Sequence, residues 1–192
     1  MFAIRPELYA TTLLCEKMDN NEALFFKGFR RHFNNKGYGD KTSYEGEAIE
    51  KYNKFVFKNE VLYDEQIVAI DAIKFKYMDP EQFHQTNIDR DIFKAYTGFS
   101  TVQSNSKIVT GGWGCGAYNG DFDLKVMIQW IAASMAGKAI VICPFGRKAN
   151  LEKGGLIKLL RNKSIGEAYK LLCLAGNTKY KDKLKEGIVE VM

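Results

Sequence analysis

The 192-residue sequence has only two histidines and four cysteines, and no two cysteines form a C-x-x-C pair. Cys15, Cys115, Cys143 and Cys173 lie far apart, which is typical of reduced thiols inside a cell. A cationic start followed by an apolar segment, the mark of a secretory signal, is also missing. We therefore expect an intracellular protein, and we assign no metal ion and no cofactor to it.

Long apolar runs are absent as well, because none approaches the roughly 20 residues needed to cross a bilayer. The longest candidate, residues 122–135, is interrupted by four polar side chains: Asp123, Lys125, Gln129 and Ser134. Internal repeats and low-complexity segments are not found. These absences favour a soluble protein with no membrane partner, and the length suits one compact domain.

Charge is distributed unevenly along the sequence. Arg147–Met192 contains eleven Lys or Arg and five Asp or Glu, a net charge of +6, whereas the whole chain carries +5. The basic end is either a solvated, lysine-rich helical surface or a region that meets polyanions.

Runs of β-forming residues predict the strands. Four such runs are Ala23–Phe29, Lys54–Phe57, Lys107–Thr110 and Ala139–Phe145. A fifth, Ile67–Ala72, is almost wholly apolar and predicts a central strand buried on both faces. The polar, glycine-dotted stretch Asn34–Lys54 predicts a long loop.

Capping residues predict the helices. Asp79, Pro80 and Gln82 suit the N-cap, the first turn and the capping-box partner of a helix that ends at Gly98. A second, nearly all-apolar helix follows Asp121 and ends at Gly137, and two more follow the last strand, the second of them starting at Ser164–Glu167. Because strands and helices alternate, we predict an α/β fold with a mixed, mostly parallel sheet.

The stretch "TGGWGCGAYNGD", Thr110–Asp121, places five glycines between a predicted strand and a predicted helix. In an open α/β sheet such a turn exposes backbone N–H groups at a helix N-terminus, beyond the carboxyl end of the strand. The N–H groups of Gly112–Tyr118 are therefore candidates for a nest that binds a phosphate or diphosphate. The spacing is neither that of a Walker loop nor that of a dinucleotide fingerprint. A glycine-rich helix entry that binds nothing is the alternative.

Two aromatic residues and a cysteine are further candidates. Tyr118 lies in the loop, and Phe145 ends the next strand, where it could stack on a base; ordinary core packing is the alternative for both. Cys115 as a nucleophile with His32 or His84 is disfavoured, because neither histidine has a supporting motif and an unpaired cysteine is more often inert.

Five segments resemble the poly(ADP-ribose) glycohydrolase family in their order and spacing. They are "AIDAIKF" (69–75), "KAYTGF" (94–99), "TGGWGCGAYNGD" (110–121), "LKVMIQWIAASMAGK" (124–138) and "PFG" (144–146). With "RPELYATTLL" and "NEALFFKGF" upstream, the resemblance covers residues 1–176 as the C-terminal portion of a catalytic domain and leaves residues 177–192 as a basic tail. It implies a macrodomain-like, three-layer α/β/α sandwich, incomplete at its N-terminal side.

The resemblance also implies a binding site for ADP-ribose. Its backbone loop would be Gly112, Trp113, Gly114, Cys115, Gly116 and Ala117, wrapped around the diphosphate and the distal ribose. Tyr118 matches a loop Phe, Phe145 matches a Phe that stacks on adenine, and Tyr38 in "KGYGD" matches the tyrosine of a mobile arm that closes over the ligand. Gly112 replaces a family Asn and Asn35 replaces a frequent Tyr, and each departure would weaken binding by about 1 kcal/mol.

The family's catalytic motif does not occur in these residues. Family hydrolysis of ribose–ribose glycosidic bonds depends on a Gly-Gly loop ending in Gln-Glu-Glu, which lies immediately before the segment matched by "MFAIRPEL"; no Gln-Glu-Glu exists here, so we assign no catalytic residue. The sequence fits part of a poly(ADP-ribose) glycohydrolase whose start has been lost, or a shortened pseudoenzyme that binds without cutting. A purely structural α/β fold is the third alternative.

The resemblance further implies the partners of the chain. These would be ADP-ribose and poly(ADP-ribose), including polymer on ADP-ribosylated proteins, with no direct reading of DNA. A nuclear or cytoplasmic location and a role in the DNA damage response would follow.

Overall fold

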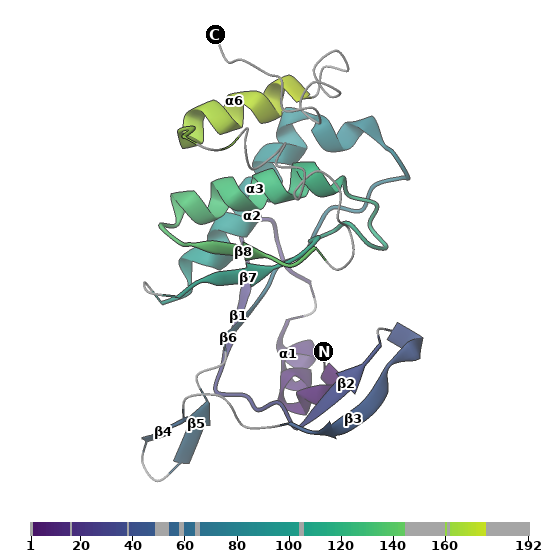
Figure 1. Ribbon diagram of the computed structural model, residues 1–192, viewed down its shortest axis with the longest axis vertical. Helices are drawn as coiled ribbons and strands as arrows, with labels where there is room; N and C mark the ends of the chain where they lie inside the picture. Colours follow the sequence, from purple (N-terminus) through teal and green to yellow (C-terminus); the bar gives the residue numbers. More distant parts are fainter. Residues whose placement is uncertain are drawn as a thin grey trace. The chain divides into compact units, whose positions relative to one another are not determined.

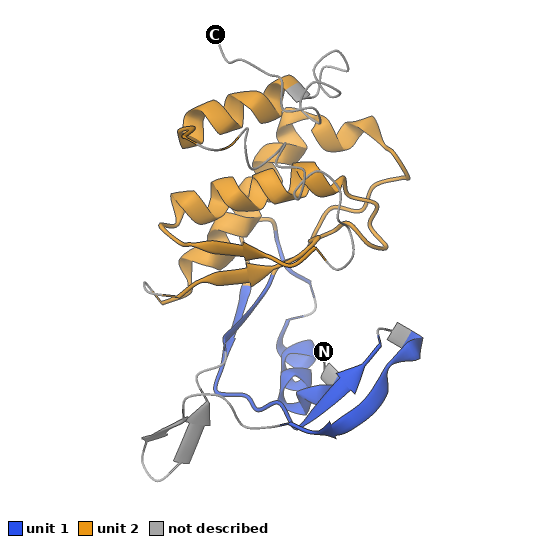
Figure 2. Ribbon diagram, viewed as in Figure 1, with its two compact units in different colours: residues 1–19, 24–69 blue, residues 20–23, 70–192 orange. Residues whose placement is uncertain are grey.

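The computed structural model describes residues 2–15, 17–37, 39–48, 54–57, 60–63, 66–103, 106–144, 160 and 162–175, which form helices and strands as an α/β fold requires (Figure 1). Contacts divide the chain into two compact units, whereas its length favours one. Unit 1 is Met1–Asp19 with Leu24–Ala69, and unit 2 is Asn20–Ala23 with Ile70–Met192 (Figure 2). The boundary between a domain at 1–176 and a tail at 177–192 stays a prediction.

Unit 1 begins with the 3-10 turns η1 (Phe2–Ile4) and η2 (Pro6–Tyr9) and the short helix α1 (Ala10–Leu14). Strand β1 (Leu24–Lys27) pairs antiparallel with β6 (Gln66–Ala69). Both strands lie where the sequence predicts them. The prediction of a central strand buried on both faces is wrong, because β6 has one partner among the described strands and all its residues are half-buried.

The predicted long loop at Asn34–Lys54 is also wrong. It contains an antiparallel hairpin, β2 (Phe33–Lys36) and β3 (Ser43–Glu47), with the 3-10 turn η3 (Gly39–Lys41) between the strands. Nearly all of the strand residues are exposed or half-buried, so no apolar alternation marked them. Strand β4 (Lys54–Phe57) was predicted, and its antiparallel partner β5 (Glu60–Tyr63) was not.

Unit 2 contains the described parallel strand pair and the three longer helices. Strands β7 (Ile108–Thr110) and β8 (Ile140–Ile142) are parallel, and helix α3 (Phe122–Met135) connects them as a crossover. The other three described strand pairs are antiparallel, which differs from the mostly parallel sheet expected. Parallel pairing occurs here where a helix crosses between two strands, and β2–β3 and β4–β5 are hairpins instead.

The start of the predicted helix after Asp79 needs a correction. Asp79 does cap, since its Oδ1 accepts a hydrogen bond from the N–H of Glu81 at 3.1 Å, but Pro80–Phe83 is the 3-10 turn η4. His84 is extended, with ψ 136°, so helix α2 is Gln85–Ser100. Gln82 is no capping-box partner, because its Nε2 donates to the carbonyl of Asp79 at 2.9 Å.

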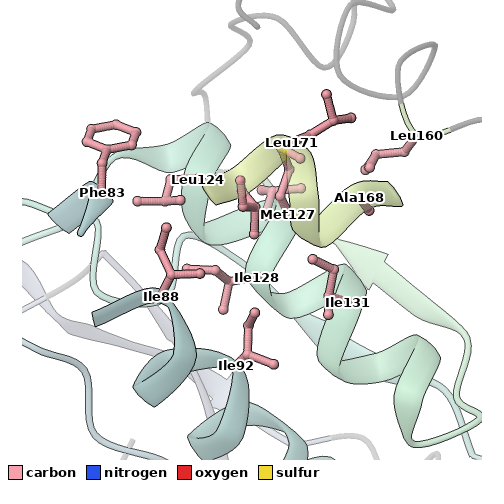
Figure 3. Close-up of a cluster of buried hydrophobic side chains, with 12 residues drawn as sticks. Phe83, Ile88, Ile92, Leu124, Met127, Ile128, Ile131, Leu160, Ala168 and Leu171 are labelled. Carbon is pink, nitrogen blue, oxygen red and sulfur yellow. The ribbon is translucent and has the colours of Figure 1, made fainter. Parts of the chain in front are cut away.

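Three helices enclose the core of unit 2: α2, α3 and α6 (Ile165–Ala175). Side chains of these helices, with Phe83 of η4 and Leu160 before α6, form one cluster, most of which is labelled in Figure 3. Its members are Phe83, Ile88, Ile92, Leu124, Val126, Met127, Ile128, Ile131, Leu160, Ala168, Leu171 and Leu172. The predicted capping box of α6 is confirmed, since Ser164 Oγ and the N–H of Glu167 are 3.3 Å apart and the N–H of Ser164 donates to Glu167 Oε2 at 2.7 Å. The helix predicted between β8 and α6 lies largely outside the described residues.

No helix in the described ranges combines the length and the apolar character that a membrane span requires.

Candidate functional site

The glycine-rich loop Gly111–Asp121 connects the carboxyl end of β7 to α3, as the sequence predicts. Asp121 caps the helix, because its Oδ1 accepts a hydrogen bond from the N–H of Leu124 at 3.0 Å. Residues 116–118 form the exposed tip of the loop, and Tyr118 is 43% exposed. The tip thus faces solvent at the N-terminal end of a buried helix.

Segment Ile70–Phe75 holds one side of this loop. Trp113 Nε1 donates to the carbonyl of Ile70 at 3.2 Å, and Asn119 Nδ2 donates to the carbonyl of Phe75 at 3.0 Å. The N–H of Phe75 in turn donates to the carbonyl of Tyr118 at 3.0 Å. Three hydrogen bonds therefore tie the middle of the loop to one neighbouring segment.

Two buried glutamines fix the ends of the loop. At its start, Gln129 Nε2 donates to the carbonyl of Gly111 at 3.2 Å, and Gln129 Oε1 accepts from Thr110 Oγ1 at 2.7 Å. At its end, Gln82 Oε1 accepts from the N–H of Asp121 at 2.6 Å. Gln82 is 4% exposed and Gln129 is fully buried, so both amides bond the chain and not solvent.

Several amide groups of the loop are left for a ligand. Four N–H groups are used within the loop: those of Trp113, Cys115, Asn119 and Gly120 donate to the carbonyls of Gly111, Gly112, Gly116 and Gly114. Within the described part of the chain, no residue accepts a hydrogen bond from the other amides, those of Gly112, Gly114, Gly116, Ala117 and Tyr118. Such backbone amides, at the N-terminus of a helix, are suited to bind an anion.

The glycines of the loop serve different purposes. Gly114 has φ +73°, and a Cβ there would lie 2.8 Å from Cβ of Ala72, so the fold itself requires glycine. At Gly116 an added Cβ would meet no atom within 4 Å and the φ is not left-handed. The absence of a side chain at Gly116 is therefore not explained by packing, and it keeps the space in front of the backbone open.

A cavity of about 350 Å³ lies beside the tip of the loop. It is lined by Tyr77, Met78, Gln82, Cys115, Gly116, Asn119, Gly120 and Asp121. Its volume is at the lower end of the range for small-molecule sites.

A cluster of charged side chains lies next to the loop. Asp71 accepts from Arg90 Nη2 and from Lys94 Nζ, both at 2.5 Å, and Arg90 Nη1 lies 3.0 Å from Oδ1 of Asp91. Asp91 Oδ2 bonds Lys125 Nζ, and Asp91, Lys94 and Lys125 are at most 2% exposed. Partial burial acts to raise the pKa of Asp71, but the hydrogen bonds from Lys94 and Arg90 outweigh it and lower that pKa.

Not every residue predicted for the site is placed. Tyr38 and Phe145 lie outside the described residues. Cys115 is 6% exposed with Sγ directed at the carbonyl of Trp113, as suits an inert cysteine, while His32 bonds Glu7 at 2.8 Å and His84 bonds Thr86 at 2.9 Å. Among the described residues, no group of three or more His, Cys, Asp or Glu is arranged to hold a metal ion.

Sequence reasoning missed three side chains that hold the loop: Gln82, Lys125 and Gln129. The signal for the last two is their spacing of four residues on an otherwise apolar helix, which puts both on one face. That face is buried against the loop.

The fold and the site together define an α/β protein with a glycine-rich loop between a parallel strand and a helix. A family model described as poly(ADP-ribose) glycohydrolase, macro domain fold, matches residues 1–152. The chain belongs to the poly(ADP-ribose) glycohydrolase family, and its fold is that of a macro domain.

Relatives from animals and plants agree with this assignment. Poly(ADP-ribose) glycohydrolase 1 of Caenorhabditis elegans is 38% identical over an alignment of 156 positions, gaps included, which covers 76% of this chain and 20% of that protein. Probable poly(ADP-ribose) glycohydrolase 2 of Arabidopsis thaliana is 26% identical over an alignment of 214 positions, gaps included, which covers 89% of this chain and 40% of that protein. The matched part is thus less than half the length of either relative.

Proposed function

We propose that this chain binds ADP-ribose units of poly(ADP-ribose), with the diphosphate held by the loop Gly112–Tyr118. The observation that carries the proposal is the set of five loop amides with no acceptor among the described residues, at the N-terminal end of α3. These unpaired N–H groups favour an anion at this place, as backbone nests do. Family membership selects ADP-ribose from among the phosphorylated ligands that such a loop would accept.

The remaining contacts of the ligand follow from the family resemblance. Tyr118, at the exposed tip, would border the distal ribose, and the neighbouring cavity of about 350 Å³ would take part of the ligand. Phe145 would stack on adenine and Tyr38 would close over the ligand. Stacking on an aromatic side chain contributes about 1–3 kcal/mol per base.

Gly116→Val tests this binding site. A Cβ added there meets no protein atom within 4 Å, so we expect the fold to tolerate a valine, while its branched side chain blocks the approach of a diphosphate to the backbone. We expect calorimetry with ADP-ribose to show binding by the 192-residue chain and none by the variant. Gly166→Val is the matched control, since Gly166 lies in α6 with equally open space around it. Equal affinity for wild type and Gly116→Val would refute the site.

Hydrolysis is a separate matter from binding. We propose that the reaction of the protein, as of its family, is cleavage of ribose–ribose bonds, and that these 192 residues supply substrate binding to it, because they contain no Gln-Glu-Glu. The alternative is a pseudoenzyme that recognises the polymer without cutting it. Release of ADP-ribose from the polymer by the protein isolated from its native cells would favour the enzyme, and binding without release would favour the pseudoenzyme.

The setting we propose is the nucleus or cytoplasm, with ADP-ribosylated proteins as partners and the DNA damage response as the process served. None of the four cysteines forms a disulfide, in keeping with a reducing compartment. Imaging of the tagged protein in cells tests the location.

A further inference from the structure

Lys125 lies directly beneath the glycine loop. It is fully buried, and its Nζ is 4.4 Å from the centroid of the Trp113 ring. A Cβ added at Gly114 or Gly120 would lie 3.4 or 3.2 Å from Cε of Lys125, so the lysine side chain packs closely against both glycines. One side chain of α3 therefore contacts the loop at three of its residues.

The position of the Lys125 ammonium is set from α2. Asp91, which is 2% exposed, bonds it with Oδ2, and Oδ1 of Asp91 bonds Arg90 at 3.0 Å. Arg90 Nη1 also donates to the carbonyl of Asp71 at 3.1 Å. In the sequence, Asp71 lies between Ile70 and Ala72. The carbonyl of Ile70 accepts a hydrogen bond from the Trp113 indole, and the side chain of Ala72 lies close to Gly114. The charged cluster is therefore linked to the loop in two ways: directly through Lys125, and through Asp71, whose two sequence neighbours contact the loop.

Stability alone is a poor reason for this arrangement. When an ion pair is buried, the loss of hydration offsets much of the attraction between the two charges. Apolar side chains of similar size often give a protein that is equally stable or more stable. What apolar side chains would not provide is an electrostatic attraction to the face of an indole. Trp113 is held in two directions, by Lys125 at its face and by the carbonyl of Ile70 at its edge.

We infer that Lys125 is a positioning residue for the ligand loop. Held by Asp91, it fixes Trp113 and through it the flanking amides of Gly112 and Gly114, which belong to the proposed diphosphate nest. Its positive charge also lies next to the place where the anion would bind. This inference rests on the proposed function and names a buried residue that would determine the affinity without touching the ligand.

The test compares three variants of the 192-residue chain. Lys125→Met keeps the length of the side chain and removes the ammonium, but it leaves Asp91 buried without that partner. Asp91→Asn with Lys125→Met removes both charges, so the double variant is the one expected to fold. Lys138→Met is the control, because Lys138 loses the same charge while bonding the carbonyls of Val102 and Gln103, just after α2.

Two readouts separate positioning from general stability. Hydrogen exchange by NMR is measured at the bonded loop amides of Cys115, Asn119 and Gly120, and affinity for ADP-ribose is measured by calorimetry. In the double variant we expect exchange at these amides to become about tenfold faster and affinity to fall about tenfold, the effect of losing one desolvated cation–π contact. Lys138→Met should change neither, whatever its melting temperature.

Loop exchange in the double variant that equals wild type, or that rises no more than in α2 and α3, would overturn the inference. Failure of the wild-type chain to bind ADP-ribose would instead refute the proposed function, and the exchange measurement would still decide the role of Lys125.

Discussion

The N–H of Asp121 donates a hydrogen bond to Oε1 of Gln82 at 2.6 Å, which joins the cap of α3 to the 3-10 turn before α2. Gln82 is buried and its Nε2 bonds the carbonyl of Asp79 at 2.9 Å. The side-chain amide therefore uses both its donor and its acceptor on backbone groups. It fixes the place where the ligand loop enters the helix.

Gln82→Leu should destabilise the protein through this contact. The leucine leaves the N–H of Asp121 without its acceptor, and an unpaired buried polar group costs about 1–3 kcal/mol. Urea unfolding followed by circular dichroism gives the change in the free energy of unfolding. Gln82→Glu keeps an acceptor oxygen and should lose less; equal losses for the two variants would show that the hydrogen bond has no such role.

Gly114→Ala and Gly116→Ala should differ sharply in stability. Alanine at Gly114 must adopt φ +73° and places Cβ 2.8 Å from Cβ of Ala72, so we expect a loss of about 2 kcal/mol or more. Alanine at Gly116 meets no neighbour and should leave the free energy of unfolding nearly unchanged. Thermal unfolding of both variants checks this, and a stability loss at Gly116 as large as at Gly114 would contradict the packing described.

The sequence predicts the elements around the loop well, because strong local signals mark them. An apolar run predicts β7. Asp121 marks the start of α3 and Gly137 its end, and the capping box of Ser164 and Glu167 marks the start of α6. The hairpin β2–β3 carries no such signal, since its residues are mostly exposed and polar on both faces. Pairing between segments, not local composition, makes it a hairpin.

In the candidate site, too, local sequence signals predict some features, whereas contacts between distant segments determine others. Glycine spacing and the resemblance predict the loop, and the structure requires glycine at Gly114, where φ is +73°. Gln82 contacts Asp121 and Lys125 contacts Asp91, 39 and 34 positions away in the sequence. The spacing of Lys125 and Gln129 indicates a polar stripe on the helix, but no local pattern shows what these side chains contact. The local pattern around Gln82 predicts a capping box, whereas its side chain bonds the carbonyl of Asp79 and the N–H of Asp121.

Aromatic substitutions should separate a nucleotide site from ordinary core. If Phe145 stacks on adenine, Phe145→Ala should weaken ADP-ribose binding by about 1–3 kcal/mol with little effect on folding. If it is core, the same change should cost about 3–5 kcal/mol of stability. Tyr38→Ala should weaken binding and leave the melting temperature nearly unchanged. A large stability loss at Phe145 with unchanged affinity at Tyr38 would defeat the assignment of both residues.

The 192-residue chain alone should not hydrolyse poly(ADP-ribose) at the rate of a full-length family member. A positioned general acid contributes typically 10²- to 10⁴-fold to such a reaction, and these residues contain no Gln-Glu-Glu to supply one. Chromatography of released ADP-ribose, with a full-length member assayed in parallel, measures the difference. A comparable rate for the two proteins would show that another residue of this chain acts as the acid.

The charged cluster beside the loop predicts a dependence of stability on pH. Lys94 and Arg90 hold the pKa of Asp71 below its ordinary value in the folded state, despite partial burial that acts in the other direction. The folded state then binds the proton more weakly than the unfolded state does. The stabilisation from Asp71 is therefore fully present above its unfolded pKa of about 4, and it is lost as the pH falls through the lower, folded pKa.

Asp71→Asn tests this dependence, because the variant lacks the titrating carboxyl and keeps a side chain of the same shape. We expect the wild type to melt at a higher temperature than the variant at neutral pH, by a difference that stays constant down to about pH 4 and shrinks below it. Carboxyl groups elsewhere, such as Glu7 in unit 1, titrate in both proteins and cancel in the comparison. Differential scanning calorimetry between about pH 2.5 and 6 measures the two melting temperatures. A difference that does not change with pH over this range would mean that Asp71 is not held as a carboxylate by Lys94 and Arg90.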